Sequence, residues 1–144
     1  MRIVSLLLSS TEIVCKWGFC KNLVGVPHEC DYPVSVKDLP ILTKPRFSPL
    51  NSSQEIDLSV QDLLKKGLSV YEVNTDLLKK LAPDLIITQA QCEACAVSLN
   101  DVKEAVSDWI GNKPDIVSLE PNYLDEVWSD FERVGEKLNC TDSY

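Results

Sequence analysis

The chain has 144 residues, of which 44% are hydrophobic and 25% are charged, which is enough apolar content for one globular domain with its own core. A formal net charge of −8 argues against a nucleic-acid partner, because such binding depends on lysine and arginine neutralising phosphates. No apolar stretch is long enough to span a bilayer, and the apolar start at Met1–Leu8 is too short for a signal peptide. We therefore expect a cytoplasmic protein, or a periplasmic one only if an upstream export signal is missing from this chain. In a reducing cytoplasm, the six cysteines are better interpreted as ligands, redox thiols or core residues than as a disulfide framework.

The first predicted unit is a strand, a turn and a helix. The apolar run Arg2–Leu7 predicts a strand, and Ser9–Glu12 matches a capping box, in which the Ser9 hydroxyl covers a free backbone N–H and Glu12 reaches back. The helix is expected to run to about Trp17 and to stop at Gly18. Because the turn contains no glycine, a dinucleotide cofactor is not expected, although the helix N-terminus could receive a smaller anion or polar group.

The middle of the chain begins with a second predicted strand, Leu23–Val26. Four prolines between residues 33 and 49 then exclude a long helix and leave room for a short strand at Ile41–Thr43. A second capping box, Ser52–Glu55, predicts a helix that ends at Lys66-Gly67. Its expected apolar stripe is Ile56, Val60, Leu63 and Leu64.

The rest of the chain alternates strands and helices. An extended piece at Leu68–Tyr71 precedes a short helix capped near Asn74, with Leu77, Leu78 and Leu81 facing inward and Pro83 closing it. The further predicted elements are a strand at Leu85–Thr88, a helix from about Ser98 to Ile110 followed by Gly111, a strand at Asp115–Leu119 and a helix at Tyr123–Leu138. The last helix carries an expected core-facing stripe of Leu124, Val127, Phe131, Val134 and Leu138. Uniformly apolar strands alternating with helices predict an α/β fold, with a three-layer, mostly parallel sheet and helices on both faces.

Two loops carry most of the reactive side chains, and each follows a predicted strand. Pro27–Tyr32 contains the only histidine, and Gln89–Cys95 contains a Cys-x-x-Cys pair. Ligands bind at the C-terminal edge of such sheets, so both loops are expected at one crevice. If they are adjacent, a zinc or iron ion could be held by His28, Cys30, Cys92 and Cys95. Alternatively, Cys92 and Cys95 form a redox dithiol, or an imidazole or thiolate approaches the cobalt of cobalamin.

Other polar side chains near these loops are candidate ligand-binding residues. Glu29, Asp31 and Glu93 are either solvated carboxylates or groups that orient His28 and receive polar groups of a ligand. Arg46 could clamp an acidic ligand. The full candidate set is Ser9, Ser10, Thr11, Glu12, Glu29, Asp31, Tyr32, Arg46, Gln89 and Glu93. No catalytic residue is expected, because one histidine without a nearby nucleophile limits acid–base chemistry. Among the other cysteines, Cys15 is interpreted as core, and Cys20 and Cys140 as incidental.

Several segments together resemble the N-terminal lobe of the iron-siderophore and cobalamin class of substrate-binding proteins of ABC importers. The segments are Arg2–Leu6, Ser9–Ile13, Leu23–Val26, Asp31–Pro33 and Ala82–Ile87. His28–Pro33 and Cys92–Ser98 look like a branch of that class labelled cobalamin-binding, whose members often lack an export signal. The resemblance covers nearly the whole chain and implies one Rossmann-like lobe of a class III periplasmic binding protein.

Two departures from that pattern shape the expected function. Leu8 stands where the class usually has proline, and the chain ends just after Tyr123–Leu138, which corresponds to the start of the helix joining two lobes. We therefore expect one lobe at residues 1–138 with a polar tail at 139–144. The chain is either a fragment or a lobe that pairs with itself or with a second lobe around cobalamin or another metal complex. The alternatives are a metal- or thiol-dependent redox protein using Cys92, Cys95 and His28, or a non-catalytic interaction lobe.

Overall fold

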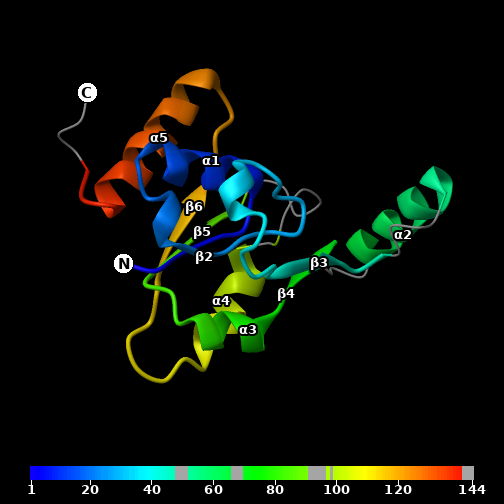
Figure 1. Ribbon diagram of the computed structural model, residues 1–144. Coiled ribbons are helices and arrows are strands. Elements are labelled where there is room, and N and C mark those ends of the chain that lie inside the picture. Colours follow the sequence, from blue (N-terminus) through cyan, green and yellow to red (C-terminus); the bar gives the residue numbers. More distant parts are fainter. Residues whose placement is uncertain (48–51, 66–69, 91–96, 98, 141–144) are drawn as a thin grey trace.

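A computed structural model describes residues 1–47, 52–65, 70–90, 97 and 99–140 (Figure 1). Its centre is a four-stranded parallel sheet in the order β2-β1-β5-β6. The strands are β1 (Ile3–Ser5), β2 (Leu23–Gly25), β5 (Leu85–Gln89) and β6 (Asp115–Leu119). The predicted α/β class and parallel sheet are confirmed. None of the described helices is long and apolar enough to cross a membrane.

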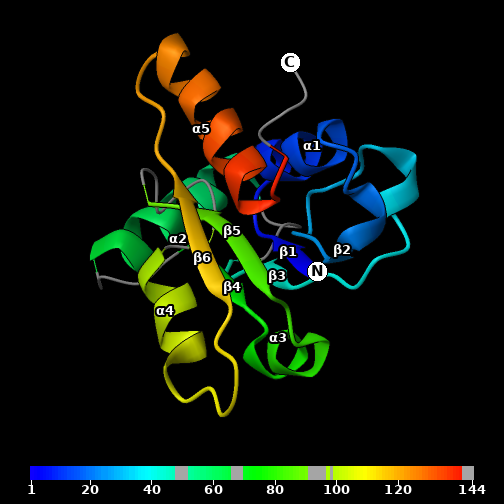
Figure 2. The same cartoon turned by 90° about the vertical axis from the view of Figure 1, so that its left-hand side faces the viewer.

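Helices cover both faces of this sheet (Figures 1 and 2). One core cluster joins the sheet to α1 (Leu8–Lys16) and α5 (Leu124–Lys137), and the other joins it to α3 (Thr75–Leu81) and α4 (Leu99–Ser107). Neighbouring residues of a strand point to opposite faces, so Ile87 belongs to the first cluster and Ile86 to the second. Burial on both faces explains why β5 is apolar at every position from Leu85 to Ile87.

The predicted capping box at the first helix is wrong. Helix α1 begins at Leu8, and its N-cap is Leu7, which makes no side-chain capping bond. Ser9 therefore lies inside the first turn. The Ser9 hydroxyl, which was expected to cap the helix, makes no such bond, and its neighbours are used in the interior, where Ser10 Oγ and Thr11 Oγ1 lie 2.5 and 2.8 Å from Ser5 Oγ. The backbone N–H groups at the start of α1 thus receive no side-chain cap, and the nearby hydroxyls instead form a buried cluster under the end of β1.

The end of α1 carries a second correction, because Cys20 is not incidental: it forms a disulfide with Cys15, which packs against the core cluster as predicted. The bond joins the last turn of α1 to the short 3-10 helix η1 (Cys20–Asn22). Gly18, with φ of +86°, supplies the left-handed residue that ends the helix where the sequence predicted. A second 3-10 turn, η2 (Val34–Val36), follows the His28 loop.

The segment after η2 forms an arm. Strands β3 (Thr43–Pro45) and β4 (Tyr71–Val73) pair as an antiparallel ribbon, and α2 (Ser53–Lys65) lies beyond it, away from the main sheet (Figure 1). The predicted strand at Ile41–Thr43 is shifted, since Ile41 makes only one bridge, to Val26. The capping box of α2 is confirmed by reciprocal bonds between Ser52 and Glu55. The expected helix end at Lys66-Gly67 and the start of the expected extended piece, Leu68-Ser69, lie outside the described residues.

Helix α3 begins where the sequence predicted, with Asn74 as its N-cap. Asn74 Oδ1 accepts a hydrogen bond from the backbone N–H of Leu77 at 3.0 Å. We expect Asn74→Ala to lower the free energy of unfolding by about 1 kcal/mol, because it leaves that N–H without its cap. Urea unfolding measures this loss, and Asn112→Ala, in an exposed loop, is the matched control. Equal stability of both variants would show that the cap contributes nothing.

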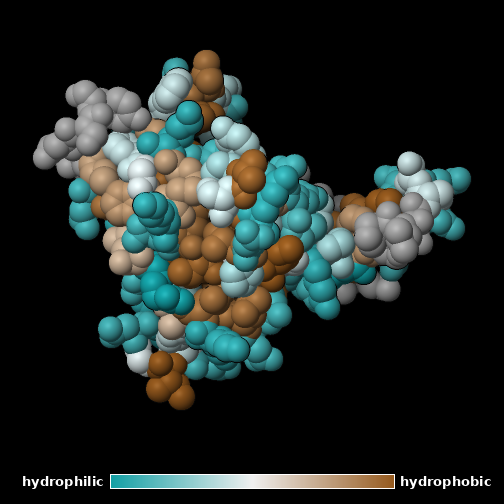
Figure 3. All heavy atoms as spheres, viewed as in Figure 1, coloured by the Kyte–Doolittle hydropathy of each residue, from teal (hydrophilic) through white to brown (hydrophobic). Residues whose placement is uncertain are grey.

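The last two helices differ from prediction at their ends. Helix α4 stops at Ser107, and Ile110 is 98% exposed beyond it. In α5 the predicted core-facing stripe is right only for its second half, where Val134 and Leu138 are buried, whereas Leu124 is 72% exposed. Apolar side chains accordingly reach the surface over the first turns of α5, at the top of Figure 3. Glu126 accepts backbone hydrogen bonds from Asn122 and Tyr123 at this helix start, and these bonds lower the pKa of its carboxyl.

Candidate functional site

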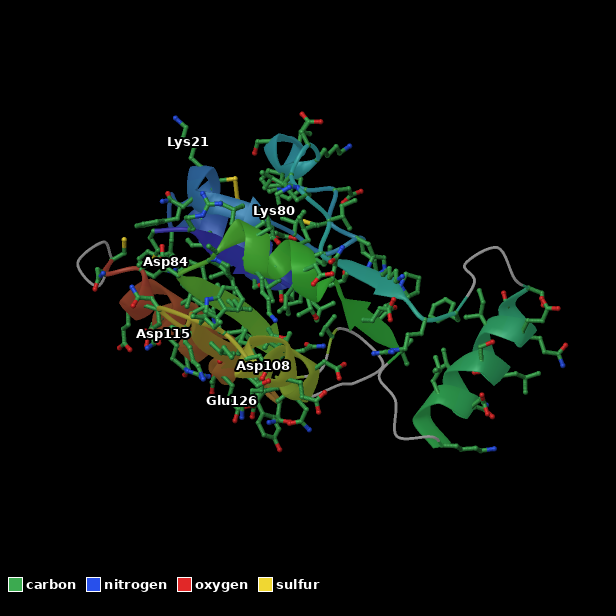
Figure 4. The ribbon with its side chains drawn as sticks, turned by 90° about the horizontal axis from the view of Figure 1, so that it is seen from below. Lys21, Lys80, Asp84, Asp108, Asp115 and Glu126 are labelled. Atoms are coloured by element: carbon green, nitrogen blue, oxygen red, sulfur yellow. A yellow bond between two sulfur atoms is a disulfide. The ribbon has the colours of Figure 1, made fainter. Side chains whose placement is uncertain are left out.

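A cavity of about 240 Å³ opens at the C-terminal ends of β1 and β5. Its lining residues come from the β1–α1 turn, the His28 loop, the arm and the end of β5: Leu6, Leu7, Leu8, Ser9, Pro27, His28, Glu29, Thr43, Tyr71, Gln89 and Val97. The opposite margin of the lobe, where strands begin, carries Lys21, Asp84 and Asp115 on the left of Figure 4. The cavity therefore lies at the edge of the sheet where the sequence predicted a ligand site.

A larger hollow of about 500 Å³ runs along β3, β4 and the start of α3. The described residues that line it include neither histidine nor cysteine, and two of its charged residues, Lys44 and Glu72, already pair at 2.8 Å. The smaller cavity holds the imidazole of His28 together with several other polar side chains, so it is the better candidate site.

Backbone pairing explains why residues distant in sequence meet in this cavity. The Val26 N–H donates to the carbonyl of Pro40, and the Leu42 N–H donates to the carbonyl of Val26. These bonds hold residues 40–42 beside the end of β2, so that Thr43 lies next to His28. The β3–β4 ribbon then places Tyr71 over the same loop, with its ring centroid 5.1 Å from that of His28.

Thr43 fixes the orientation of His28. Its Oγ1 accepts the backbone N–H of His28 at 3.0 Å and lies 2.7 Å from Nδ1 of the ring. If the ring is protonated on Nδ1, this nitrogen donates to Thr43 and Nε2 becomes free to bind a metal, which is the usual arrangement of a ligating histidine. The side chain of His28 is 24% exposed and lines the cavity.

Glu29 joins His28 to Tyr71. Its Oε1 lies 3.6 Å from Nε2 of His28 and accepts a hydrogen bond from the Tyr71 hydroxyl at 3.4 Å. Burial raises the pKa of Tyr71 above its ordinary value, and the negative charge and hydrogen bond of Glu29 raise it further. The cavity thus combines an imidazole, a carboxylate and a phenol, and Phe47 lies beside Tyr71 with the ring centroids 6.3 Å apart.

The titration of Tyr71 tests this geometry. In wild-type protein, the absorbance at 295 nm should show a late step, in which Tyr71 ionises above the ordinary tyrosine pKa. Because the folded pKa is raised, stability begins to fall once pH exceeds the ordinary value near 10 and continues to fall up to the raised value. Tyr71→Phe should remove the late step, and Glu29→Gln should move it to lower pH. A late step that survives in Tyr71→Phe would contradict the assignment.

The predicted ligand-binding residues do not all meet at the cavity. Ser9, Glu29 and Gln89 line it together with His28, whereas Ser10 and Thr11 are buried beneath the turn. The others are elsewhere. Glu12 and Tyr32 line a hollow beside the disulfide, Asp31 is exposed, Arg46 pairs with Glu72 at 3.5 Å, and Glu93 lies outside the described residues.

The predicted four-ligand metal site can be described only in part. Cys92 and Cys95 lie outside the described residues. Cys30 packs against the α1–α5 core cluster, and its sulfur lies 3.5 Å from the carbonyl of Tyr32, so it does not line the cavity that holds His28. Among the described residues, no three histidine, cysteine or acidic side chains converge to hold a metal ion. The four-ligand site stays a prediction.

Thr43 and Tyr71 are cavity residues that the sequence reasoning missed. Both fall on extended segments that the pattern predicted, at or near their observed strands. Their relation to His28 depends on pairing across 15 and more than 40 residues, for which the sequence contains no local signal.

No protein-family profile matches the chain, and no curated protein sequence matches it. Several solved protein structures do match the chain. A possible iron-binding periplasmic solute-binding protein from Staphylococcus epidermidis is 26% identical with a TM-score of 0.63, and the match covers 97% of this chain and 43% of that one. The periplasmic vitamin B12 binding protein of Vibrio cholerae is 21% identical with a TM-score of 0.63, covering 94% and 40%. A periplasmic heme binding protein from Pseudomonas aeruginosa is 19% identical with a TM-score of 0.64, covering 97% and 39%.

The chain thus has the fold of one lobe of the iron, heme and B12 substrate-binding proteins, and it spans about two fifths of the length of these solved chains. This confirms the resemblance seen in the sequence. The neighbours are binding proteins rather than enzymes, in line with the expectation that this chain is not an enzyme.

Proposed function

We propose that the cavity at the C-terminal edge of the sheet binds a small metal complex, with cobalamin as the first candidate. The observation that carries this proposal is the His28 ring, which lines the cavity and whose Nδ1 lies 2.7 Å from Thr43 Oγ1. An imidazole oriented in this way suits coordination of cobalt, iron or nickel in a bound complex. The solved structures that the chain resembles are named for iron, heme, vitamin B12 or nickel, which supports this ligand class.

The other cavity residues would hold the periphery of such a ligand. Ser9, Gln89 and Tyr71 offer hydrogen-bonding groups, and Leu6 and Val97 offer apolar surface. A few polar groups on a mostly apolar wall are typical of small-molecule sites. Glu29 supplies a negative charge beside Nε2 of His28, which favours a cationic metal centre over an anionic one.

The Cys92-x-x-Cys95 loop belongs to the proposal through its neighbours in the chain. Gln89 and Val97, which flank the loop, both line the cavity. We propose that this loop contacts the same ligand. The more specific proposal is that His28, Cys30, Cys92 and Cys95 coordinate a metal ion directly. The alternative of a redox protein using Cys92 and Cys95 predicts a dithiol that cycles without loss of a bound ligand.

A single lobe covers only one side of a ligand, so we propose a partner for the other side. Residues 1–138 would act as one lobe, and 123–138 as the start of an inter-lobe helix, with a second lobe or a second copy closing the cavity. The exposed apolar side chains at the start of α5 support this arrangement. Delivery to an ABC transporter would follow from the same arrangement.

The proposal allows two cellular locations for this protein. We retain the cytoplasm, with the periplasm as the alternative suggested by the neighbours. The Cys15–Cys20 pair separates them, because it should be reduced in the cytoplasm and oxidised in the periplasm of rapidly alkylated cells.

The test of function is a binding screen on protein purified under reducing, oxygen-free conditions. Metal content and the absorption spectrum are measured first, and hydroxocobalamin, hemin and Ni²⁺ are then titrated while absorbance and heat are followed. We expect saturable binding of at least one of them, at one equivalent per chain or per pair of chains. Protein that arrives metal-free and binds none of the three would overturn the proposal.

A further inference from the structure

We infer that the Cys15–Cys20 disulfide is a thiol–disulfide exchange site, whose substrates are small thiols or dithiol proteins. Both cysteines are partly exposed, and they line an open hollow of about 350 Å³ together with Glu12, Lys16, Tyr32 and Ser35. A disulfide must be reachable by a thiolate before it can exchange, and this one opens onto a space large enough for a thiol side chain. The site is separate from the proposed ligand cavity, since none of the described residues lines both.

The disulfide is one of several contacts that hold the end of α1. Other contacts already hold the end of α1: the Trp17 indole N–H donates to the carbonyl of Phe131 at 3.0 Å, and the Phe19 N–H donates to the carbonyl of Val14 at 3.1 Å. The disulfide closes a loop over a sequence separation of only 5, and closure of a short loop stabilises a fold less than closure of a long one. Reduction should therefore leave the lobe folded, which is a requirement for reversible exchange.

The two sulfurs are not equivalent. Cys20 Sγ lies 3.4 Å from the hydroxyl oxygen of Ser35, and because a disulfide sulfur has no proton, Ser35 must be the donor. Cys15 lies in the last turn of α1, where the helix dipole disfavours a negative charge. A thiolate released at Cys20 is therefore stabilised, whereas one released at Cys15 is not.

This asymmetry defines the direction of exchange. The incoming thiolate attacks Sγ of Cys15 and forms a mixed disulfide with it, while the Cys15–Cys20 bond breaks and its electron pair leaves on Cys20 as a thiolate that accepts the Ser35 hydrogen bond. A second thiol then displaces Cys15 from the mixed disulfide. Overall, two thiols are oxidised to one disulfide and the protein gains two thiols, which balances both atoms and electrons.

The positions of lysines make the redox state readable in the wild-type chain. Trypsin cuts after Arg2, Lys16 and Lys21, so Cys15 and Cys20 lie on separate peptides, Ile3–Lys16 and Trp17–Lys21. The native protein is incubated with reduced and oxidised glutathione at several ratios, free thiols are alkylated, and the digest is analysed by mass spectrometry. We expect the two peptides to be joined at oxidising ratios and separately alkylated at reducing ones, while circular dichroism stays unchanged.

Ser35→Ala tests the assigned leaving group, with Ser107→Ala as the matched surface control. The rate of reduction by glutathione should fall about fivefold in Ser35→Ala and remain unchanged in Ser107→Ala. Two peptides that are never joined under oxidising conditions, or a joined pair that resists reduction until the protein unfolds, would overturn the exchange site. An unchanged rate in Ser35→Ala would overturn Cys20 as the leaving group. Ligand binding by the same samples reports separately on the proposed function.

Discussion

Replacing His28 with alanine is expected to weaken binding of the metal complex at least tenfold, which corresponds to about 1.4 kcal/mol. The substitution removes the only imidazole in the chain, which lines the cavity. Because the His28 side chain is 24% exposed and lies at the rim rather than in the core, the free energy of unfolding should change little. Titration calorimetry with the ligand that wild-type protein binds, together with urea unfolding of both proteins, measures the two effects separately.

Two substitutions of Thr43 serve as matched controls for His28. Thr43→Val removes the oxygen that holds the ring while keeping the side-chain shape, so affinity should fall about threefold to tenfold with the imidazole still present. Thr43→Ser keeps that oxygen and should bind like wild type. If His28→Ala binds as tightly as wild type, the imidazole does not contact the ligand, and the role assigned to Thr43 is lost with it.

Replacing Gly135 with alanine should destabilise the lobe by about 2 kcal/mol. Gly135 is buried in α5, and a methyl group added there would overlap the indole ring of Trp17. That ring cannot move freely, because it stacks on Phe131 at 5.0 Å and its N–H donates to the Phe131 carbonyl at 3.0 Å. Overpacking lowers the free energy of unfolding by about 1–3 kcal/mol, and loss of the Trp17–Phe131 hydrogen bond lowers it by about 1 kcal/mol. The better helix propensity of alanine offsets about 1 kcal/mol of this loss.

The origin of this loss can be separated from a general effect on the helix. Ser129→Ala, at an exposed position of the same helix, should leave the urea midpoint within experimental error of wild type. In a Trp17→Leu background, Gly135→Ala should cost much less, because the smaller side chain leaves room for the methyl group. An equal cost in both backgrounds would place the strain somewhere other than the Trp17 contact.

Most of the sheet could be predicted because its strands are buried on both faces. A run such as Leu85–Ile87 is apolar at every position, and this pattern is hard to reconcile with any exposed element. The caps of α2 and α3 were also predictable, since Ser52 with Glu55, and Asn74, make bonds within three residues of themselves.

Features that depend on distant partners could not be predicted. The stripe of α5 identifies an apolar face but does not reveal that the core of this lobe reaches only its second half. Ser9 looked like a capping residue because its pattern with Glu12 is local, whereas the hydroxyl cluster of Ser10 and Thr11 depends on Ser5 in the preceding strand. Cys15 and Cys20 carry no pattern that distinguishes a bonded pair from two packed thiols.

In the candidate site, too, residues identified by local sequence were predicted, and residues brought in by distant pairing were not. Sequence reasoning placed His28, Glu29, Ser9 and Gln89 at one edge of the sheet, and these four line one cavity. It did not find Thr43 and Tyr71, which belong to strands β3 and β4 of the arm. It also included Arg46, whose ion pair with Glu72 lies at a different hollow. The local sequence shows where a strand ends. It does not show which distant side chains pack around the residue that follows the strand.

The measurement that tests the central claim most directly is an NMR titration of ¹⁵N-labelled protein with hydroxocobalamin, hemin or Ni²⁺, using whichever binds. The account predicts that amide signals of Leu7, Ser9, His28, Tyr71 and Gln89 shift or broaden together with one binding constant, while Asp101 and Glu104, at the hollow near Arg46, stay unchanged. A ligand that binds but perturbs the hollow near Arg46, or the disulfide region, and leaves His28 unaffected would contradict a ligand site at the C-terminal edge of the sheet.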